Sequence, residues 1–305
     1  MRALVSSPSP PYAELSEVPD PRPERHQALV EVRAFSLNRG ETTRLASMEP
    51  GSVTGWDVAG VVRVPAADGS GPPHGVRVVG LVQVGAWAEL AAVSTDVLAE
   101  IPDQVSFEQA ATLPVAGITA VRAFEVGGFV LGKRVLVTGA SGGVGRFAIQ
   151  LGKLAGAHVT ALARRTGGLS ELGADEVIHE LEPEGPRFDV ILDAVGGPTL
   201  AAAIGRVAPS GTIVSFAATT DEPVTFSTRT LYRGAPGACI YGLFVFLELA
   251  ERASGTSDLR RLAELVAAGE LDPQIDFVAS WKEAGSAIEA LLDRRVNGKA
   301  VLTVG

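Results

Sequence analysis

The chain has 305 residues, of which 46% are hydrophobic and 35 are glycine, so its length allows about two domains of a turn-rich α/β protein. Its formal net charge of -9 excludes the general basic face that nucleic acid or an anionic membrane would need. Cys239 is the only cysteine, which excludes an intrachain disulfide and a multi-cysteine zinc site, and which favours a reducing, cytoplasmic location. We expect its side chain to pack inside the fold.

Neither a secretory signal nor a membrane span is expected. The N-terminal apolar stretch reaches Pro8 too soon to contain the apolar core of a secretory signal. The longest apolar region, 238–247, is too short to cross a bilayer, and its composition predicts a buried strand that runs into a helix.

Residues 1–110 predict an antiparallel β domain, because short β-rich runs without helical periodicity are separated by proline and glycine breaks. Asn38 lies in a polar loop that follows one of these runs. Its side chain can either face a ligand or initiate a short helical turn by capping, and the spacing leaves both interpretations open. The predicted strands are 28–34, 58–64, 76–84 and 86–93.

The sequence becomes helical from Phe107 to Phe124, with a largely apolar face, and this helix is expected to join the first domain to a second. Thr119 lies inside it. Its hydroxyl can either reach a bound ligand or bond to the helix backbone, as threonines in helices commonly do.

The stretch from Lys133 to Gly152 predicts a strand, a glycine turn and a helix. Gly142 lets the backbone approach a pyrophosphate, Gly145 lets the helix pack near the strand, and the free N–H groups at the helix start offer donors and positive potential. This geometry favours a dinucleotide; the alternative is a tight turn without a ligand. The pattern A-x-G-x-x-G departs from the strict G-x-G-x-x-G rule at its first position. The residues expected to contact the dinucleotide are Gly139, Ala140, Ser141, Gly142, Gly143, Val144 and Gly145.

The residues after the next β-like run, 157–163, predict which dinucleotide binds. An acidic residue about 20 residues beyond the glycine turn would hold the adenosine ribose of NAD. Arg164 and Arg165 stand there instead, and two guanidiniums suit a 2′-phosphate through charge-assisted hydrogen bonds. NADPH is therefore expected in preference to NADH, unless the two arginines form only a solvated loop pair.

Alternating strands and helices predict that the second domain is a doubly wound parallel sheet. Strands are expected at 176–178, 190–193 and 212–216, with a helix from about Thr199. Residues that directly follow such strands lie at the carboxyl edge of the sheet, where ligands bind. The cofactor-lining residues expected there are Ala194, Val195, Phe216 and Ala217.

The last part of the chain is expected to return to the first domain, because the nucleotide sheet already has about six strands. The predicted domain limits are therefore 1–110, 111–258 and 259–305. The expected elements are a β-like run at 239–244, an amphipathic helix at 258–268, a β-like run at 277–279, a helix at 281–292 and a strand at 299–304.

Several motifs line up together in one order along nearly all of the chain. They are Asn38, Gly55-x-Asp57-x-x-Gly60, residues 114–120, the glycine turn 139–145, Asp193-Ala194-Val195-Gly196 and Gly298-Lys299-Ala300-Val301-Leu302. With these motifs the chain resembles a zinc-independent medium-chain dehydrogenase/reductase. It is similar to the quinone oxidoreductase or ζ-crystallin group and to the enoyl reductase domains of polyketide synthases.

The resemblance implies a GroES-like β domain built from both chain ends, an inserted Rossmann domain and an active site in the cleft between them. It also implies a homodimer formed by Rossmann edge strands, here 239–244. Zinc-dependent relatives use cysteine, histidine and acidic ligands, but this chain has no cysteine before 239 and its four histidines lack ligand spacing. No metal is therefore expected.

The resemblance also implies the residues near the reacting atoms. Asn38 takes the family's asparagine position beside the nicotinamide, where its amide can orient the cofactor or the acceptor. The family often places a tyrosine proton donor on the loop after this asparagine, but residues 39–56 contain no tyrosine. Tyr241 is therefore the alternative proton donor. The other interpretations are that Tyr241 packs at a dimer edge and that solvent protonates the product. Gly242 and Leu243 belong to the same segment, which lines the nicotinamide end in relatives.

The chemistry expected without zinc or a flavin motif is hydride transfer from NADPH to a quinone or to the β-carbon of an enone. One alternative is an enoyl-thioester reductase of a polyketide or fatty-acid pathway. Another is a nicotinamide-nucleotide-binding module with little turnover.

Overall fold

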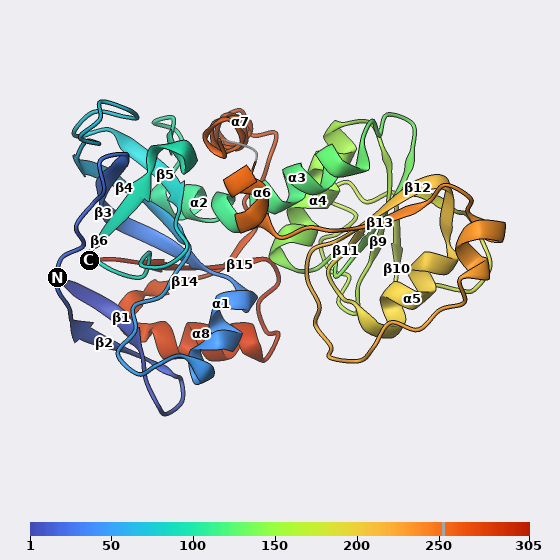
Figure 1. The fold of residues 1–305 in the computed structure, drawn as a ribbon, viewed down its shortest axis with the longest axis horizontal. Helices are drawn as coiled ribbons and strands as arrows, with labels where there is room; N and C mark the ends of the chain where they lie inside the picture. The colour runs from blue at the N-terminus through green and yellow to red at the C-terminus, as the bar shows by residue number, and fades with distance from the viewer. Residues whose placement is uncertain (252–253) are drawn as a thin grey trace. The chain divides into compact units, whose positions relative to one another are not determined.

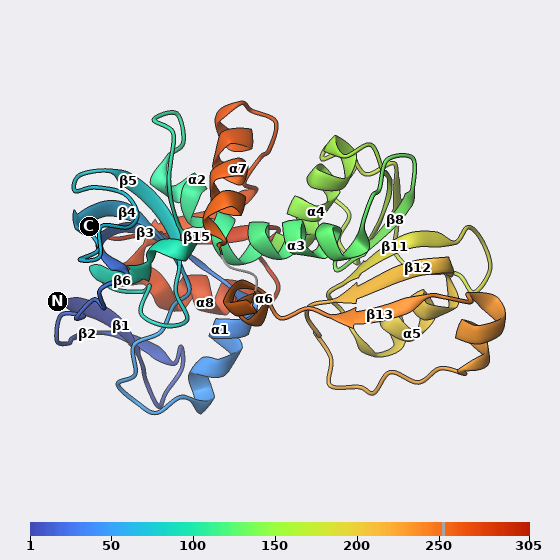
Figure 2. The same cartoon turned by 45° about the horizontal axis from the view of Figure 1, so that its top comes forward.

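The computed structural model describes residues 1–251 and 254–305. Within them the chain folds into two compact units, which are a GroES-like β domain and a Rossmann domain, as the sequence predicts. We call the first unit 1 (Met1–Ile118 with Leu249–Gly305) and the second unit 2 (Thr119–Glu248). Figures 1 and 2 show their elements.

The limits of the two units differ from the predicted limits at residues 110 and 258. Helix α2 (Phe107–Ala111) packs on strands β3 and β4, and helix α7 (Thr256–Ala267) packs on strand β7 and on the turn 113–117. These contacts place both segments in unit 1, because a segment belongs to the core against which it buries its apolar side chains.

Unit 1 is built around a largely antiparallel sheet with the order β14-β15-β3-β4-β5-β7, and β6 also pairs with β3. The C-terminal strand β15 pairs antiparallel with β3, which brings the last strand of the chain into the sheet formed by β3 to β7. A separate hairpin joins β1 to β2. The strands are β1 (Arg2–Ser6), β2 (Ala13–Glu17), β3 (Gln27–Leu37), β4 (Asp57–Val64), β5 (Arg77–Leu81), β6 (Leu90–Ser94), β7 (Leu98–Glu100), β14 (Ile275–Ser280) and β15 (Lys299–Thr303).

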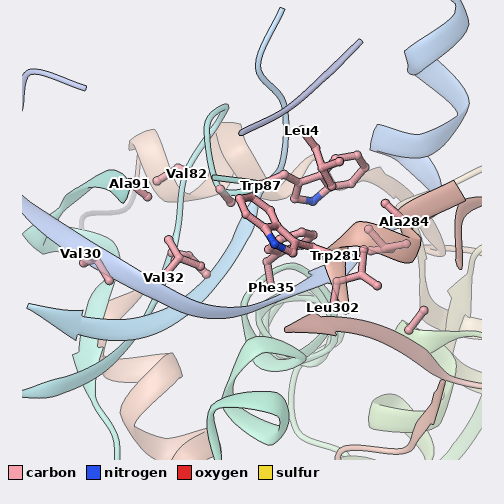
Figure 3. Close-up of a cluster of buried hydrophobic side chains, with 14 of the residues drawn as sticks. Leu4, Val30, Val32, Phe35, Val82, Trp87, Ala91, Trp281, Ala284 and Leu302 are labelled. Carbon is pink, nitrogen blue, oxygen red and sulfur yellow. The ribbon is translucent and has the colours of Figure 1, made fainter. Parts of the chain in front are cut away.

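The core of unit 1 holds the ends of β3 and β15 in place. Phe35 and Trp87 stack with ring centroids 5.8 Å apart, and Trp281 is fully buried in the same cluster (Figure 3). Leu302 of β15 also lies in this cluster. The backbone near residues 35 and 302 is therefore anchored by large apolar side chains that have no alternative place to pack.

The helix predicted from Phe107 to Phe124 is broken. Helix α2 is followed by a π-helical turn at Leu113–Gly117 and then by α3 (Ile118–Gly127). Pro114 lacks a backbone N–H, so the regular α-helical ladder cannot run through it. The remaining helices of unit 1 are α1 (Arg39–Arg44) and α8 (Ala284–Leu292), and 3-10 turns lie at Leu45–Ser47, Thr95–Val97 and Trp281–Glu283.

Unit 2 is a doubly wound parallel sheet with the order β10-β9-β8-β11-β12-β13. The chain changes direction across the sheet between β8 and β11, where ligands of such folds bind. The strands are β8 (Arg134–Thr138), β9 (His158–Leu162), β10 (Glu176–Ile178), β11 (Phe188–Asp193), β12 (Val207–Ser215) and β13 (Cys239–Gly242). The helices are α3, α4 (Gly143–Leu154), α5 (Gly197–Gly205), a π-helical turn (Thr230–Gly234) and α6 (Val245–Glu251), whose last residues belong to unit 1.

The region 238–247 corrects two expectations. Strand β13 is not buried, since among the described residues it lies at the sheet edge with β12 as its single neighbour, and Ile240 is 43% exposed. Cys239 is also exposed rather than packed inside the fold. The apolar composition of this region therefore does not reflect burial within the single chain.

Two predicted strands are shorter than expected. The run 76–84 forms a strand only at Arg77–Leu81, and the run 86–93 only from Leu90. Within the part of the chain that the structure describes, no helix combines the length and the apolar character needed to cross a bilayer.

Candidate functional site

The glycine turn of unit 2 connects β8 to α4 with very close backbone packing. Gly139 has a φ of 62°, which favours glycine. A Cβ on Gly145 would lie 2.7 Å from Ala140 Cα and 2.7 Å from the Gly139 carbonyl oxygen. The first turn of α4 therefore contacts the preceding turn at a distance that no side chain permits.

The outer side of the same turn is open. Gly142 is exposed and forms the N-cap of α4, and a Cβ there would meet one neighbouring atom, the Gly139 carbonyl oxygen at 3.3 Å. The first-turn N–H groups of an α-helix point out of its N-terminus and carry positive potential. An exposed helix N-terminus of this kind can bind a phosphate group.

Arg146 is a residue of this site that the sequence analysis missed. It follows Gly145 on α4 and is 6% exposed. Its Nε donates a hydrogen bond to the Ser141 carbonyl oxygen (3.3 Å), and its Nη2 donates to the Gly167 carbonyl oxygen (2.9 Å). The guanidinium thus joins the glycine turn to the loop after β9. The sequence feature that could have identified Arg146 is an arginine within an otherwise apolar helix face.

That loop carries the two arginines predicted to select the cofactor. Arg164 is exposed and Arg165 is half-buried. The Ala140 N–H donates to the Leu162 carbonyl oxygen (3.2 Å), so the glycine turn lies directly beside the end of β9. The structure therefore brings the arginine loop and the glycine turn together.

The predicted wall residues also gather at the carboxyl edge of the sheet. A Cβ on Gly139 would lie 3.2 Å from the Ala194 Cβ, and the Phe216 N–H donates to the Asp193 carbonyl oxygen (3.0 Å). The buried Asp193 carboxylate accepts hydrogen bonds from the hydroxyl of Thr138 (2.7 Å) and from that of Ser215 (3.3 Å). Asp193 thus ties together the ends of β8, β11 and β12.

The remaining predicted residues of unit 2 are more dispersed. Ala217 and Gly242 are exposed, Leu243 is buried, and Thr119 is buried near the start of α3. The Tyr241 hydroxyl donates to the Glu248 carboxylate. Tyr241 is therefore engaged within unit 2.

A second group of polar side chains lies in unit 1, and it surrounds Asn38. This residue follows β3 and forms the N-cap of α1, and its N–H donates to Glu41 Oε1 (2.7 Å). Its side-chain Nδ2 donates to Asp57 Oδ2 (2.7 Å) and to Glu41 Oε1 (3.0 Å). Lys299 Nζ donates to Asn38 Oδ1 (2.7 Å). The residue therefore initiates the helical turn with its backbone while its side chain joins a polar cluster.

Asp57 is the centre of this cluster. Its carboxylate is fully buried and accepts hydrogen bonds from the Ser36 hydroxyl (2.5 Å) and, at Oδ1, from the Val115 N–H (2.8 Å). Lys299 Nζ lies 3.4 Å from Oδ2, and Lys299 is 2% exposed. We call Ser36, Asn38, Glu41, Asp57 and Lys299 the polar cluster. The sequence motifs contained Asp57 and Lys299, but pattern alone assigned them no contact.

Glu41 is the second carboxyl group of the polar cluster and is 1% exposed. Its Oε2 is buried and has no hydrogen-bond partner among the residues that the structure describes. Burial, and then the nearby charge of Asp57, raise the pKa of Glu41 well above its usual value of 4.5. A protonated Glu41 leaves the Asp57 carboxylate and the Lys299 ammonium as a neutral pair.

Replacing Glu41 by glutamine is expected to change how stability depends on pH. Above pH 4.5 the unfolded wild-type chain releases a proton that folded Glu41 retains, so the wild-type free energy of unfolding falls as pH rises toward the raised pKa. Glu41→Gln cannot ionise. Its thermal midpoint should therefore rise relative to wild type as pH increases above about 4.5 toward the raised pKa of Glu41.

Thermal unfolding of both proteins across this pH range measures the effect. Glu49→Gln, at an exposed glutamate of the same unit, is the matched control and should show a constant difference from wild type. If the difference in thermal midpoint between Glu41→Gln and wild type did not vary with pH, the expectation that ionisation of buried Glu41 destabilises the fold would be wrong.

The donor set does not fit a metal ion. Among the described residues there is no group of three or more histidine, cysteine, aspartate or glutamate side chains that could hold one. In the polar cluster, the Lys299 ammonium lies 2.7 Å from Asn38 Oδ1 and would repel a second cation.

Comparisons with known proteins agree with the two-unit fold. A family profile described as "Zinc-binding dehydrogenase" matches residues 172–302. The mitochondrial NAD(P)H oxidoreductase of Mus musculus is 34% identical, over 82% of this chain and 70% of its own. The chain belongs to the medium-chain dehydrogenase/reductase family.

Two further relatives place this medium-chain dehydrogenase/reductase among redox enzymes. The quinone oxidoreductase from Coxiella burnetii superimposes with a TM-score of 0.86 and 28% identity, covering 100% of this chain and 99% of that chain. The 2-methylene-furan-3-one reductase of Solanum lycopersicum is 36% identical over 59% of this chain and 53% of its own. The protein is thus an oxidoreductase of this family, and the family implies a nicotinamide cofactor.

Proposed function

We propose that the protein is an NADPH-dependent oxidoreductase that reduces a quinone or the activated C=C bond of an enone without zinc. The observation that carries this proposal is the open glycine turn joined through Arg146 to the loop of Arg164 and Arg165. When bound, the reduced nicotinamide supplies the hydride. The relatives named for a quinone and for a methylene-furanone support these two acceptor classes.

The preference for NADPH rests on charge at the end of β9. A 2′-phosphate is a dianion that pairs well with guanidinium groups, and Arg164 and Arg165 occupy the loop where the adenosine ribose is expected. Arg146 holds the backbone of this loop at Gly167. This contact supports the proposal, because it fixes the backbone of the loop that carries the two arginines.

Removing both loop arginines is expected to raise the KM for NADPH by about 100-fold or more, because each charge-assisted hydrogen bond contributes about 1.5–3 kcal/mol. The KM for NADH should change little, since NADH lacks the 2′-phosphate. Steady-state kinetics of Arg164→Ala/Arg165→Ala with both nucleotides measures this. Arg260→Ala/Arg261→Ala, at an adjacent exposed pair on α7, is the matched control. Equal effects on both nucleotides would remove the specificity argument.

The function itself is tested by NADPH oxidation with a panel of quinones, enones and enoyl thioesters. Turnover that is fastest with quinones or enones supports the proposal. A preference for thioesters indicates instead an enoyl reductase that serves a carrier-bound chain. Saturable NADPH binding without turnover of any acceptor indicates a nicotinamide-nucleotide-binding module with little turnover. If neither NADPH nor NADH binds, the proposal is wrong.

Asn38 is proposed to meet the bound nicotinamide nucleotide, by its position in the family motif. The proposed source of the product's proton is solvent. The Tyr241 hydroxyl, which was the side-chain candidate, already donates to the Glu248 carboxylate.

We further propose that the protein forms a homodimer through β13. This strand ends the parallel sheet of unit 2, and Ile240 and Phe244 are 43% and 56% exposed. An unpaired strand edge with exposed apolar side chains favours pairing with a second copy. Analytical ultracentrifugation measures the mass in solution.

A further inference from the structure

The side chain of Asn38 has nearly exhausted its hydrogen-bonding capacity inside the polar cluster. A carboxamide offers two N–H donors and two oxygen lone pairs. Both donors are used, one by Asp57 Oδ2 (2.7 Å) and one by Glu41 Oε1 (3.0 Å). One lone pair of Oδ1 accepts from Lys299 Nζ (2.7 Å). The second lone pair of Oδ1 is what the group can still offer to a ligand.

The orientation of this carboxamide is determined by the chemistry of its partners. An ammonium can only donate, so the atom that faces Lys299 must be the amide oxygen. Glu41 Oε1 already accepts the Asn38 backbone N–H (2.7 Å), so it is an acceptor toward Nδ2 as well. If the amide were flipped, its NH₂ group would face the Lys299 ammonium, and both groups are donors. Its oxygen would face the Asp57 carboxylate, and both groups are acceptors.

The partners of Asn38 are themselves fixed. Lys299 begins β15, whose next residue, Ala300, pairs with Leu37 of β3, and Lys299 Nζ also lies 3.4 Å from the Leu37 carbonyl oxygen. Asp57 is 0% exposed and Lys299 is 2% exposed, whereas Asn38 is only half-buried. Asn38 is therefore the member of the polar cluster that reaches the surface, and rigid, buried charges stand behind it.

We propose that Lys299 and Asp57 are positioning residues that hold Asn38 as a hydrogen-bond acceptor toward a donor of the bound nicotinamide nucleotide. The donor is a ribose hydroxyl or the carboxamide NH₂ of the nicotinamide. This assignment rests on the proposed function. It excludes Asn38 as a donor to the oxyanion or enolate of the reduced acceptor, because both of its N–H groups are committed to carboxyl groups.

A double-mutant cycle tests whether Lys299 acts through Asn38. Asn38→Ala and Lys299→Met are each expected to lower kcat/KM for NADPH by about 10- to 100-fold, as small losses of alignment do. The double variant should be no worse than Asn38→Ala alone, because the group that Lys299 positions is already gone. Lys299→Arg keeps a donor and should recover part of the loss. Lys282→Met, at an exposed lysine of unit 1, is the control. The proposal would be overturned if the losses in kcat/KM of the two single variants multiplied in the double variant. It would also be overturned if Lys299→Met had wild-type kinetics.

A second measurement covers the outcome that Lys299→Met does not fold, since it leaves Asp57 buried without its cation. The chain contains one other asparagine, Asn297, so wild-type protein labelled with ¹⁵N at asparagine alone gives two side-chain NH₂ signals to assign. Both Asn38 NH₂ protons should exchange with solvent about tenfold or more slowly than those of Asn297. Equal exchange rates would show that the donors of Asn38 are free, which overturns the proposal.

Titration of the wild-type protein with NADPH separates this inference from the proposed function. If no saturable binding occurs, the proposed function fails and the ligand role of Asn38 fails with it, whatever the exchange rates. If NADPH binds and is oxidised while the double-mutant cycle shows multiplying losses, only the positioning role of Lys299 fails.

Discussion

Gly145→Ala is expected to destabilise unit 2 by about 3 kcal/mol and to abolish measurable NADPH binding, because overpacking a rigid backbone contact forces the backbone to move. The new Cβ would lie 2.7 Å from Ala140 Cα and 2.7 Å from the Gly139 carbonyl oxygen. Both atoms belong to the backbone, so no rotamer change can relieve the overlap. Moving the turn apart from α4 would also displace the N–H groups proposed to hold the pyrophosphate. Thermal unfolding and NADPH titration measure the two effects.

Gly205→Ala provides the matched control for this substitution. Gly205 ends α5 in the same unit, and no described heavy atom lies within 4 Å of a Cβ built there. Alanine should be neutral there or stabilising by about 0.5–1 kcal/mol, and nucleotide affinity should not change. If Gly145→Ala behaved like Gly205→Ala in both measurements, the close packing of α4 on the glycine turn would not matter for binding.

Asp57→Ala is expected to lower the free energy of unfolding of unit 1 by about 3–5 kcal/mol, as removal of one partner from a buried ion pair does. The variant leaves the Lys299 ammonium buried without its carboxylate and removes the acceptor used by Ser36 and Val115. Denaturant unfolding followed by tryptophan fluorescence measures the loss. All three tryptophans of the chain, at 56, 87 and 281, lie in unit 1, so the signal reports on that unit.

Glu31→Ala is the control that separates the effect of losing a buried ion pair from the effect of losing any ion pair. Glu31 lies 2.8 Å from Arg33 in the same unit, but both side chains are nearly half exposed, at 44% and 47%. Solvent screening limits the contribution of such a pair to about 0–1 kcal/mol. A loss for Asp57→Ala no larger than the loss for Glu31→Ala would show that the polar cluster does not stabilise unit 1.

The features that the sequence predicted correctly are those written in neighbouring residues. The change from β-branched residues to glycines to helical spacing predicted β8, the turn and α4, because backbone sterics and periodicity act over a few residues. The alternation that follows predicted the doubly wound sheet and, with the order of the motifs, the family. The prediction of a helical segment from Phe107 to Phe124 was correct only in part, since Pro114 has no N–H to donate and a π-helical turn separates α2 from α3.

The polar cluster shows what local pattern does not contain. Asn38, Asp57 and Lys299 are separated by 19 and 242 residues along the chain, and they meet because β15 pairs with β3 and β3 pairs with β4. The same holds for Arg146, whose contact with Gly167 depends on how α4 lies against β9.

Composition, glycine spacing and residue periodicity were therefore enough to predict the two kinds of domain and the glycine turn between β8 and α4. They were not enough to show which apolar run lies at a sheet edge, as β13 does, or which charged side chains are buried together. Burial and hydrogen-bond partners come from strands that are distant in sequence and adjacent in space, so their energies appear only when the sheets have formed.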